Sequence, residues 1–239
     1  GYLTELHGKP VTEDRIQVTA SGMAAVSIAL AAILRPGDRV VLHSPIWPNI
    51  VNAVHLRGGE VATLDLIAEP EGSFRLDLDR LDTLLAGARA FILNSPSNPT
   101  GWTATRDELQ AILELARRHH VWLISDEVYS RLIYTGPSAA PSLLDVAEPD
   151  DRVMVCNSFS KTWVMTGWRL GWLVVPQGLR DAITEIVEVV HSGVAPFIQQ
   201  AGIAAIADTA GVEQFRSHCA TGRTLAGQAL DGVNGIRYA

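Results

Sequence analysis

The sequence predicts an α/β protein with a mostly parallel sheet that helices cover on both faces. Short apolar runs alternate along the chain with segments of helical periodicity, and several polar residues follow the ends of these runs. Nearly continuous apolar runs are typical of strands buried on both faces, and their alternation with helices favours parallel pairing. After a first short strand near Val18, the predicted strands are Arg39–Leu42, Glu60–Leu64, Ala90–Leu93, Val121–Ser125, Arg152–Cys156 and Gly171–Val175.

Two segments between these strands carry clear helix signals. The first strand leads into an alanine-rich segment that we expect to be helical as far as about Leu34. Farther on, Thr105 and Glu108 form a capping-box pattern, which marks the start of a helix. The apolar residues that follow it at helical spacing are Leu109, Ile112, Leu113 and Ala116. We expect the polar stretch Glu69–Arg75 to be a surface loop.

Composition excludes several classes of function. The chain has 239 residues, 47% hydrophobic content and a formal net charge of −7, which fits a substantial core and gives no electrostatic footprint for nucleic acid. Cys156 and Cys219 are too few for a disulfide framework, and no metal-ligand spacing with the histidines is found. The sequence shows neither a signal-peptide pattern nor an apolar run of transmembrane length. We therefore expect a cytoplasmic protein without nucleic-acid or membrane partners.

A lysine set among small hydroxyl residues is the most informative feature of the chain. Lys161 follows Ser158 and Ser160 after a predicted strand, and Arg169 comes later in the same segment. A free lysine has a pKa of about 10.4, and burial or a nearby cation lowers it so that the amine can react with an aldehyde. Arg169 could be that cation or could bind a phosphate beside the two serine hydroxyls. An isolated Ser-x-Ser-Lys sequence would equally fit an exposed polar turn.

A buried strand that ends on two acids and a tyrosine supports the presence of a ligand site. Asp126 and Glu127 directly follow the strand, and Tyr129 comes next in the segment. Such an acid could hold magnesium in a nucleoside triphosphatase, but the Gly-x-x-x-x-Gly-Lys-Ser/Thr loop is absent from the sequence. Asp126 could instead bind a cationic ring nitrogen through a hydrogen bond worth about 1.5–3 kcal/mol. We assign no role to Glu127.

Three other segments offer groups for an anionic, aromatic ligand. Ser21, Gly22 and Met23 begin the alanine-rich helix, and a helix N-terminus binds phosphate through free N–H groups and its dipole. Ser21 would also fit an ordinary N-cap. Trp47 lies between prolines, where it could stack on a ring or simply occupy a surface turn. Asn98 lies in a turn rich in proline and asparagine.

Taken in order, these segments resemble those of the class I and II aminotransferases, fold-type-I enzymes related to aspartate aminotransferase that use pyridoxal 5′-phosphate. The resemblance runs from about Ile16 to about Val175. It implies a mostly parallel seven-stranded sheet sandwiched by helices, and a Schiff base between the cofactor and a lysine. The implied catalytic residues are Lys161, Asp126 and Tyr129. The implied cofactor-binding residues are Ser21, Gly22, Met23, Ser158, Ser160 and Arg169 for the phosphate, Asn98, Asp126 and Tyr129 for the ring, Trp47 for stacking, and Lys161.

The resemblance also implies a division of the chain. Residues 1–209 are expected to form the large domain that binds the cofactor, and residues 210–239 an interdomain helix and the start of a small domain. A helical pattern from about Val212 to about Leu230 fits that helix. Members of the family are longer at both ends, so we expect the small domain to be largely missing, together with the arginine for the substrate α-carboxylate. The chain alone could then be folded but inactive.

The implied activity is transfer of an amino group from an amino acid to a 2-oxo acid, in a homodimer. The segment His191–Phe197 is expected to reach the neighbouring subunit's site, and its lack of arginine disfavours a dicarboxylic substrate. The apolar stretch Val187–Ile206 fits either a partner surface or an internal helix pair. A lyase or decarboxylase on the same fold is one alternative, and an aminotransferase-like sensor domain of a transcription regulator is another.

Overall fold

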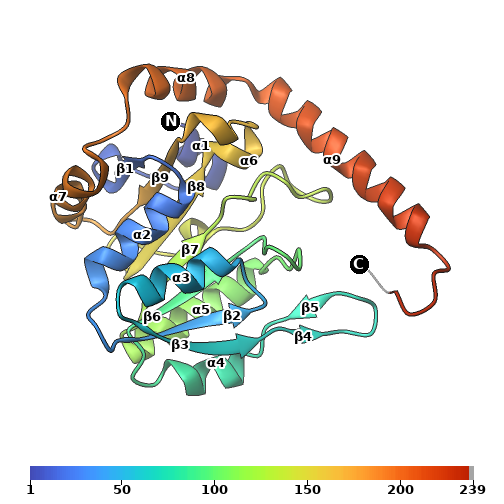
Figure 1. The fold of residues 1–239 in the computed structure, drawn as a ribbon, viewed down its shortest axis with the longest axis horizontal. Helices are drawn as coiled ribbons and strands as arrows, with labels where there is room; N and C mark the ends of the chain where they lie inside the picture. The colour runs from blue at the N-terminus through green and yellow to red at the C-terminus, as the bar shows by residue number, and fades with distance from the viewer. Residues whose placement is uncertain (237–239) are drawn as a thin grey trace.

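The computed structural model describes residues 1–236 and contains one large sheet with helices on both faces (Figure 1). Within these residues, seven strands form the sheet in the order β1-β9-β8-β7-β6-β2-β3. Strand β9 is antiparallel to both of its neighbours, and the other six run in one direction. The strands are β1 (Ile16–Thr19), β2 (Arg39–Ser44), β3 (Glu60–Asp65), β6 (Ala90–Asn94), β7 (Trp122–Asp126), β8 (Val153–Ser158) and β9 (Gly171–Val174).

The predicted seven-stranded, mostly parallel sheet is confirmed, and the strands differ from the predicted ranges only at their ends. The expected loop at Glu69–Arg75 is partly wrong. Phe74 and Arg75 form strand β5 (Phe74–Arg75), which pairs with β4 (Ile67–Ala68) in a separate hairpin. The Arg75 Nε atom lies 2.5 Å from Glu69 Oε1, so an ion pair supports the hairpin. Residues 69–75 are exposed or half-buried, and such exposure does not exclude a strand.

The helices form two layers. The buried apolar side chains form two hydrophobic clusters, one on each side of the sheet. Helices α2, α3 and α7 contribute to one cluster, and helices α4 and α5, which contact each other, contribute to the other (Figure 1). The helices are α1 (Tyr2–His7), α2 (Gly22–Ile33), α3 (Pro48–Leu56), α4 (Leu78–Leu85), α5 (Arg106–His119), α6 (Phe159–Thr162), α7 (Arg180–His191), α8 (Pro196–Ala207) and α9 (Thr209–Leu230).

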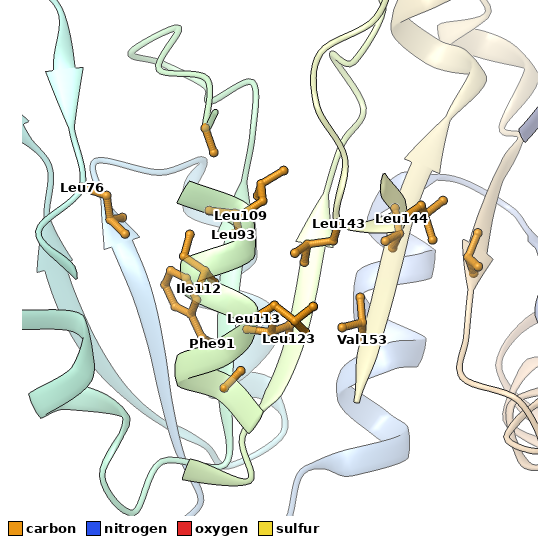
Figure 2. Close-up of a cluster of buried hydrophobic side chains, with 14 of the residues drawn as sticks. Leu76, Phe91, Leu93, Leu109, Ile112, Leu113, Leu123, Leu143, Leu144 and Val153 are labelled. Atoms are coloured by element: carbon orange, nitrogen blue, oxygen red, sulfur yellow. The ribbon is translucent and has the colours of Figure 1, made fainter. Parts of the chain in front are cut away.

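Successive residues of the central strands face opposite layers, as the two-residue period of a strand requires. Phe91 and Leu93 of β6 belong to the cluster under α5, whereas Ile92 belongs to the cluster under α2. Figure 2 shows Leu109 and Ile112 of α5 over the first of these clusters. Full burial of one such side chain contributes about 1.5–3 kcal/mol, so the two layers fix the sheet from both sides.

Helix α5 begins where its capping box predicts. Thr105 Oγ1 accepts the Glu108 N–H at 3.2 Å, and Glu108 Oε2 accepts the Thr105 N–H at 2.7 Å. At the other end, Arg117 binds both carboxylate oxygens of Asp151 at 2.8 and 2.6 Å. The capping box pairs N–H groups at the start of the helix, and the positive charge of Arg117 complements the dipole at its end. The bonds to Asp151 also hold the end of α5 against the loop before β8.

Helix α9 extends away from the sheet (Figure 1). It corresponds to the predicted helix near Val212–Leu230 and begins at Thr209. Its first part is tied to the body of the molecule by Arg216, which donates to the Ile133 carbonyl at 3.1 Å. Within residues 1–236, no helix is both long and apolar enough to cross a bilayer.

Candidate active site

All eleven residues predicted to bind the cofactor line one pocket of about 340 Å³. The pocket lies where β6, β7 and β8 end and where α2 begins, which is the edge of a parallel sheet that usually binds ligands. Asn49, Asn94 and Val128 also line it and were not assigned to the site from the sequence. The sequence therefore predicted the convergence of these residues, and their individual contacts with a ligand stay predictions.

Two larger cavities lie elsewhere. One of about 380 Å³ is mostly apolar, lies between α1, the first residues of β9 and α8, and contains none of the predicted site residues. The other, of about 1120 Å³, is lined by the β4–β5 turn, the Asn98 turn and Arg223 of α9, and shares Tyr129 with the 340 Å³ pocket. Among these three cavities of residues 1–236, only the 340 Å³ pocket brings together a lysine, a buried acid and a helix N-terminus. We therefore take this pocket as the candidate site, although it is the smallest of the three.

The head of α2 forms one wall of the pocket. Ser21 caps the helix, because its Oγ atom accepts the Ala24 N–H at 3.0 Å. Gly22 and Met23 occupy the first turn, where backbone N–H groups lack intrahelical acceptors and the dipole is positive. A Cβ atom on Gly22 would lie 3.0 Å from Val128 Cγ1 and 3.2 Å from Ser158 Cβ. The glycine thus allows the helix head to approach the other walls closely.

Gly171 is a second glycine with this function, and its packing against the head of α2 was not recognised from the sequence. A Cβ atom at this first residue of β9 would lie 2.7 Å from the Asn157 carbonyl oxygen and 2.9 Å from the Gly22 nitrogen. These are backbone atoms, so a side chain could be accommodated only by moving the head of α2. The close packing of β9 against this turn has no signal in the local sequence, because the two segments are distant in the chain.

The lysine loop forms the opposite wall. Ser158 begins the short helix α6, and its Oγ atom accepts the Ser160 N–H at 3.1 Å and lies 2.9 Å from Ser160 Oγ. Lys161 Nζ lies 5.6 Å from the centre of the Tyr129 ring. Arg169 is exposed and has a φ of 56°, an uncommon conformation for a non-glycine residue, while it donates to the Thr166 carbonyl at 2.6 Å. The hydrogen bond to Thr166 comes from Nη1 of the guanidinium, and Arg169 lines the pocket.

Asp126 ends β7 at the base of the pocket. Burial raises the pKa of its carboxyl to about 6, against the opposing effects of the Val128 N–H and the Lys161 ammonium. The hydrogen bond from Val128 is long, at 3.3 Å. The carboxylate has thus lost most of its hydration without a strong replacement among the described residues, and a cationic hydrogen-bond donor in the pocket would stabilise it.

Asn94 connects the Asn98 turn to the end of β7. Its Oδ1 atom accepts the Asn98 N–H at 2.7 Å, and its Nδ2 atom donates to the Asp126 carbonyl at 3.1 Å. Asn98 Nδ2 in turn lies 3.4 Å from the Tyr129 hydroxyl. Three predicted site residues are thereby held in one network by a side chain that is 1% exposed.

Glu127, which received no role from the sequence, is part of the scaffold beneath the site. Burial raises the pKa of its carboxyl to about 7. Its Oε1 atom accepts the Ser125 hydroxyl at 2.9 Å and the Leu143 N–H at 3.1 Å, which joins β7 to the chain before β8. Trp47 lies at the head of α3, lines the pocket and is 43% exposed. No cluster of three or more potential metal ligands is found within residues 1–236.

Comparison with known proteins agrees with this geometry. The family model of aminotransferase class I and II matches residues 2–237. An aspartate aminotransferase of Thermotoga maritima is 34% identical over 203 residues, which cover 84% of this chain and 53% of that protein. An arginine–pyruvate transaminase of Pseudomonas aeruginosa is 32% identical and covers 96% of this chain and 58% of its own length. The chain therefore spans about half the length of the curated relatives it matches.

Solved structures give the same result. The N-succinyldiaminopimelate aminotransferase of Mycobacterium tuberculosis superposes with a TM-score of 0.89 at 28% identity, over 98% of this chain and 61% of that one. The Thermotoga maritima aspartate aminotransferase superposes with a TM-score of 0.82 at 32% identity, over 90% and 57% respectively. The chain belongs to the aminotransferase class I and II family, whose members use pyridoxal 5′-phosphate.

Proposed function

We propose that the 340 Å³ pocket binds pyridoxal 5′-phosphate and that the protein transfers an amino group from an amino acid to a 2-oxo acid. The observation that carries this proposal is the gathering of Lys161, Asp126 and the head of α2 in one pocket. Membership of the family supports it, as do relatives named as transaminases of aspartate and of arginine with pyruvate.

The pocket fits the cofactor at both ends. At one end, the N–H groups of Gly22 and Met23, the Ser158 and Ser160 hydroxyls, and Arg169 can hold a phosphate. At the other end, the buried Asp126 carboxylate can bind a protonated ring nitrogen, because burial has already made the ionised carboxyl unfavourable without such a partner. Asn98 and Tyr129 would hold the ring oxygen, and Trp47 would cover one face of the ring.

Lys161 would carry the covalent link through its Nζ atom and would later act as the base. The bound cofactor supplies an electron sink for the carbanion that forms when the substrate Cα loses its proton. Lys161 Nζ accepts that proton and returns it, a positioned acid–base step that typically contributes about 10²–10⁴-fold in rate. Asp126 would hold a protonated ring nitrogen through its carboxylate, while Tyr129 lies beside Lys161 and would hydrogen-bond near the reacting atoms.

We further propose a division of the chain into domains, a dimeric active unit and a cytoplasmic location. Residues 1–209 form the large domain and residues 210–239 begin the interdomain helix and small domain, although the last three residues lie outside the described part of the chain. The active unit is a homodimer in the cytoplasm, with the His191–Phe197 segment at the partner's site. The strong exposure of Val189, Phe197 and Ile203 on α7 and α8 supports an interface there.

A donor screen tests the proposed activity. The full-length protein, loaded with pyridoxal 5′-phosphate, is mixed with a panel of amino acids and one 2-oxo acid, and the amino acid formed is measured by chromatography. Transfer from at least one donor, dependent on the cofactor, is the expected result. Cofactor-dependent loss of carbon dioxide or ammonia without transfer would instead support a lyase or decarboxylase.

A further inference from the structure

A buried histidine lies directly behind the candidate site and takes no part in the proposed chemistry. His43 belongs to β2 and is fully buried. Strands β2 and β6 are neighbours in the sheet (Figure 1), but their paired residues end at Leu42 and Ile92. Beyond that point, His43 of β2 pairs with β3, and Asn94 of β6 pairs with β7. The sheet therefore separates at its ligand-binding edge, beside the imidazole of His43.

The imidazole replaces the missing backbone pairing. Its Nε2 atom lies 3.1 Å from the Asn94 nitrogen and 3.2 Å from the Asn94 carbonyl oxygen. Burial lowers the pKa of His43 to about 4, although the carbonyls of Asn94 and Pro45 oppose the shift, so the ring is neutral near pH 7. A neutral ring with its proton on Nδ1 can accept the Asn94 N–H at Nε2, whereas the other tautomer would leave that N–H facing a second donor.

The position of His43 is determined by its surroundings. The Trp102 ring meets the imidazole edge-on, with the ring centres 5.5 Å apart. Nδ1 is buried and has no hydrogen bond of good geometry within residues 1–236. The Pro45 carbonyl raises the pKa of the ring as a hydrogen-bond acceptor, which agrees with a proton on Nδ1. Within residues 1–236, the hydrogen bonds of good geometry made by the imidazole are those with Asn94.

We propose that His43 is a positioning residue for the cofactor site and acts through Asn94. By accepting the Asn94 N–H, it fixes the residue whose side chain binds both the Asn98 N–H and the Asp126 carbonyl. Loss of the acceptor would leave the Asn94 N–H buried and unpaired, and the end of β6 would shift to satisfy it. Asn98 and Asp126 would then lose the geometry with which they meet the ring. The inference rests on the proposed function.

Cofactor titration of four proteins tests the inference. His43→Leu removes the acceptor, His43→Gln keeps one, and Val41→Ala is a control that weakens the core two residues away on the same face of β2, in the cluster that also contains Trp102. The dissociation constant for pyridoxal 5′-phosphate is measured by fluorescence, and the melting temperature is measured without the cofactor. We expect His43→Leu to weaken binding about tenfold, His43→Gln to restore binding to within about threefold of the wild type, and Val41→Ala to lower only the melting temperature.

Wild-type affinity in His43→Leu would overturn the inference. So would a loss of affinity in Val41→Ala that matches that of His43→Leu at an equal loss of melting temperature. Should His43→Leu fail to fold, ¹⁵N NMR of the wild-type imidazole decides, because a proton on Nδ1 is expected and a proton on Nε2 would contradict the role. A wild-type protein that does not bind the cofactor would refute the proposed function, and the NMR result would still test His43.

Discussion

Residues 16–175 and residues 180–236 differ in how far their large apolar side chains are buried. In the first region, the strands and helices bury most of them in two clusters on either side of the sheet, and the candidate site lies at the edge of that core. In the second region, Val189, Phe197 and Ile203 are 89%, 71% and 63% exposed. Exposed apolar side chains on two successive helices are expected where a chain binds another protein surface.

The difference indicates that cofactor binding and assembly depend on different parts of the chain. The polar side chains of the site are held by bonds within the first region, such as those of Asn94 and Ser158. The exposed side chains of α7 and α8 have no comparable cover within residues 1–236. Variants in the first region should therefore change cofactor chemistry, and variants in the second should change association.

The largest effect is expected for Lys161→Ala. The substitution removes the base that we propose moves the Cα proton, and such a base contributes up to about 10⁴-fold. Turnover of the full-length protein should fall by about that factor, measured by steady-state transamination, while the phosphate contacts still allow the cofactor to bind. Lys9→Ala is the matched control, because Lys9 does not line the pocket and makes an exposed ion pair with Glu148. Activity within tenfold of the wild type would contradict the role of Lys161.

A smaller loss of activity is expected for Asp126→Asn. The amide cannot form the charge-assisted bond with a protonated ring nitrogen, a bond worth about 1.5–3 kcal/mol. Turnover should fall about 10–100-fold. The ring nitrogen of the bound cofactor should also lose its proton at a lower pH, which is measured by absorbance. Unchanged turnover and an unchanged spectrum would show that Asp126 does not meet the ring.

The same variant should stabilise the cofactor-free protein. The folded pKa of Asp126 is raised from 3.8 to about 6, so its neutral form is favoured in the folded state, and the associated stability is lost as pH rises through 6. Above that pH the folded protein must hold a buried charge, which Asp126→Asn removes. Urea unfolding at pH 8 should show a gain on the order of 2–3 kcal/mol that vanishes below about pH 4. A loss of stability at pH 8 would mean that the carboxylate has a strong partner in the fold.

Gly171→Ala tests the close packing of β9 against the head of α2. The added methyl group would lie within 3 Å of backbone atoms, so we expect a loss of about 1–3 kcal/mol in unfolding free energy and weaker cofactor binding. Gly167→Ala is the matched control, because nothing lies within 4 Å of a Cβ atom there. Equal effects of the two substitutions would contradict a special role for Gly171.

The smallest change in folding stability is expected for Phe197→Ser. The side chain is exposed, so the unfolding free energy should change by no more than about 0.5 kcal/mol, whereas sedimentation of the full-length protein should show dissociation. Leu56→Ser, at an 86% exposed residue of α3, should leave the association unchanged. If both variants sediment like the wild type, α8 is not the interface that we propose.

The sequence was sufficient where a local pattern fixes the outcome. Continuous apolar runs identified the strands, and the capping box at Thr105 identified the start of α5. The short spacing of Ser158, Ser160 and Lys161 also identified one wall of the pocket, since a turn of helix holds them together. These features depend on residues that are close in the chain.

The sequence was insufficient where contacts join distant segments. Asn94 follows the predicted strand Ala90–Leu93 and received no role, and its importance emerges only when its side chain is seen to bind the end of β7. His43 lay just beyond the predicted strand Arg39–Leu42 and received no role, although its imidazole binds a residue of another strand. Gly171 read as a strand residue, and only the packing of β9 shows what a side chain there would meet. The hairpin at Phe74 was missed because each of its strands is only two residues long, which is too short to show the pattern of a strand.

The most direct test of the central claim is to locate the covalent link with the cofactor. The protein is loaded with pyridoxal 5′-phosphate, reduced with borohydride and digested, and the modified peptide is identified by mass spectrometry. Residues 1–239 contain two lysines, Lys9 and Lys161, so the two outcomes within this chain are well separated. The account predicts a reduced adduct on Lys161 that disappears in Lys161→Ala. An adduct on Lys9, or one that persists in Lys161→Ala, would contradict it.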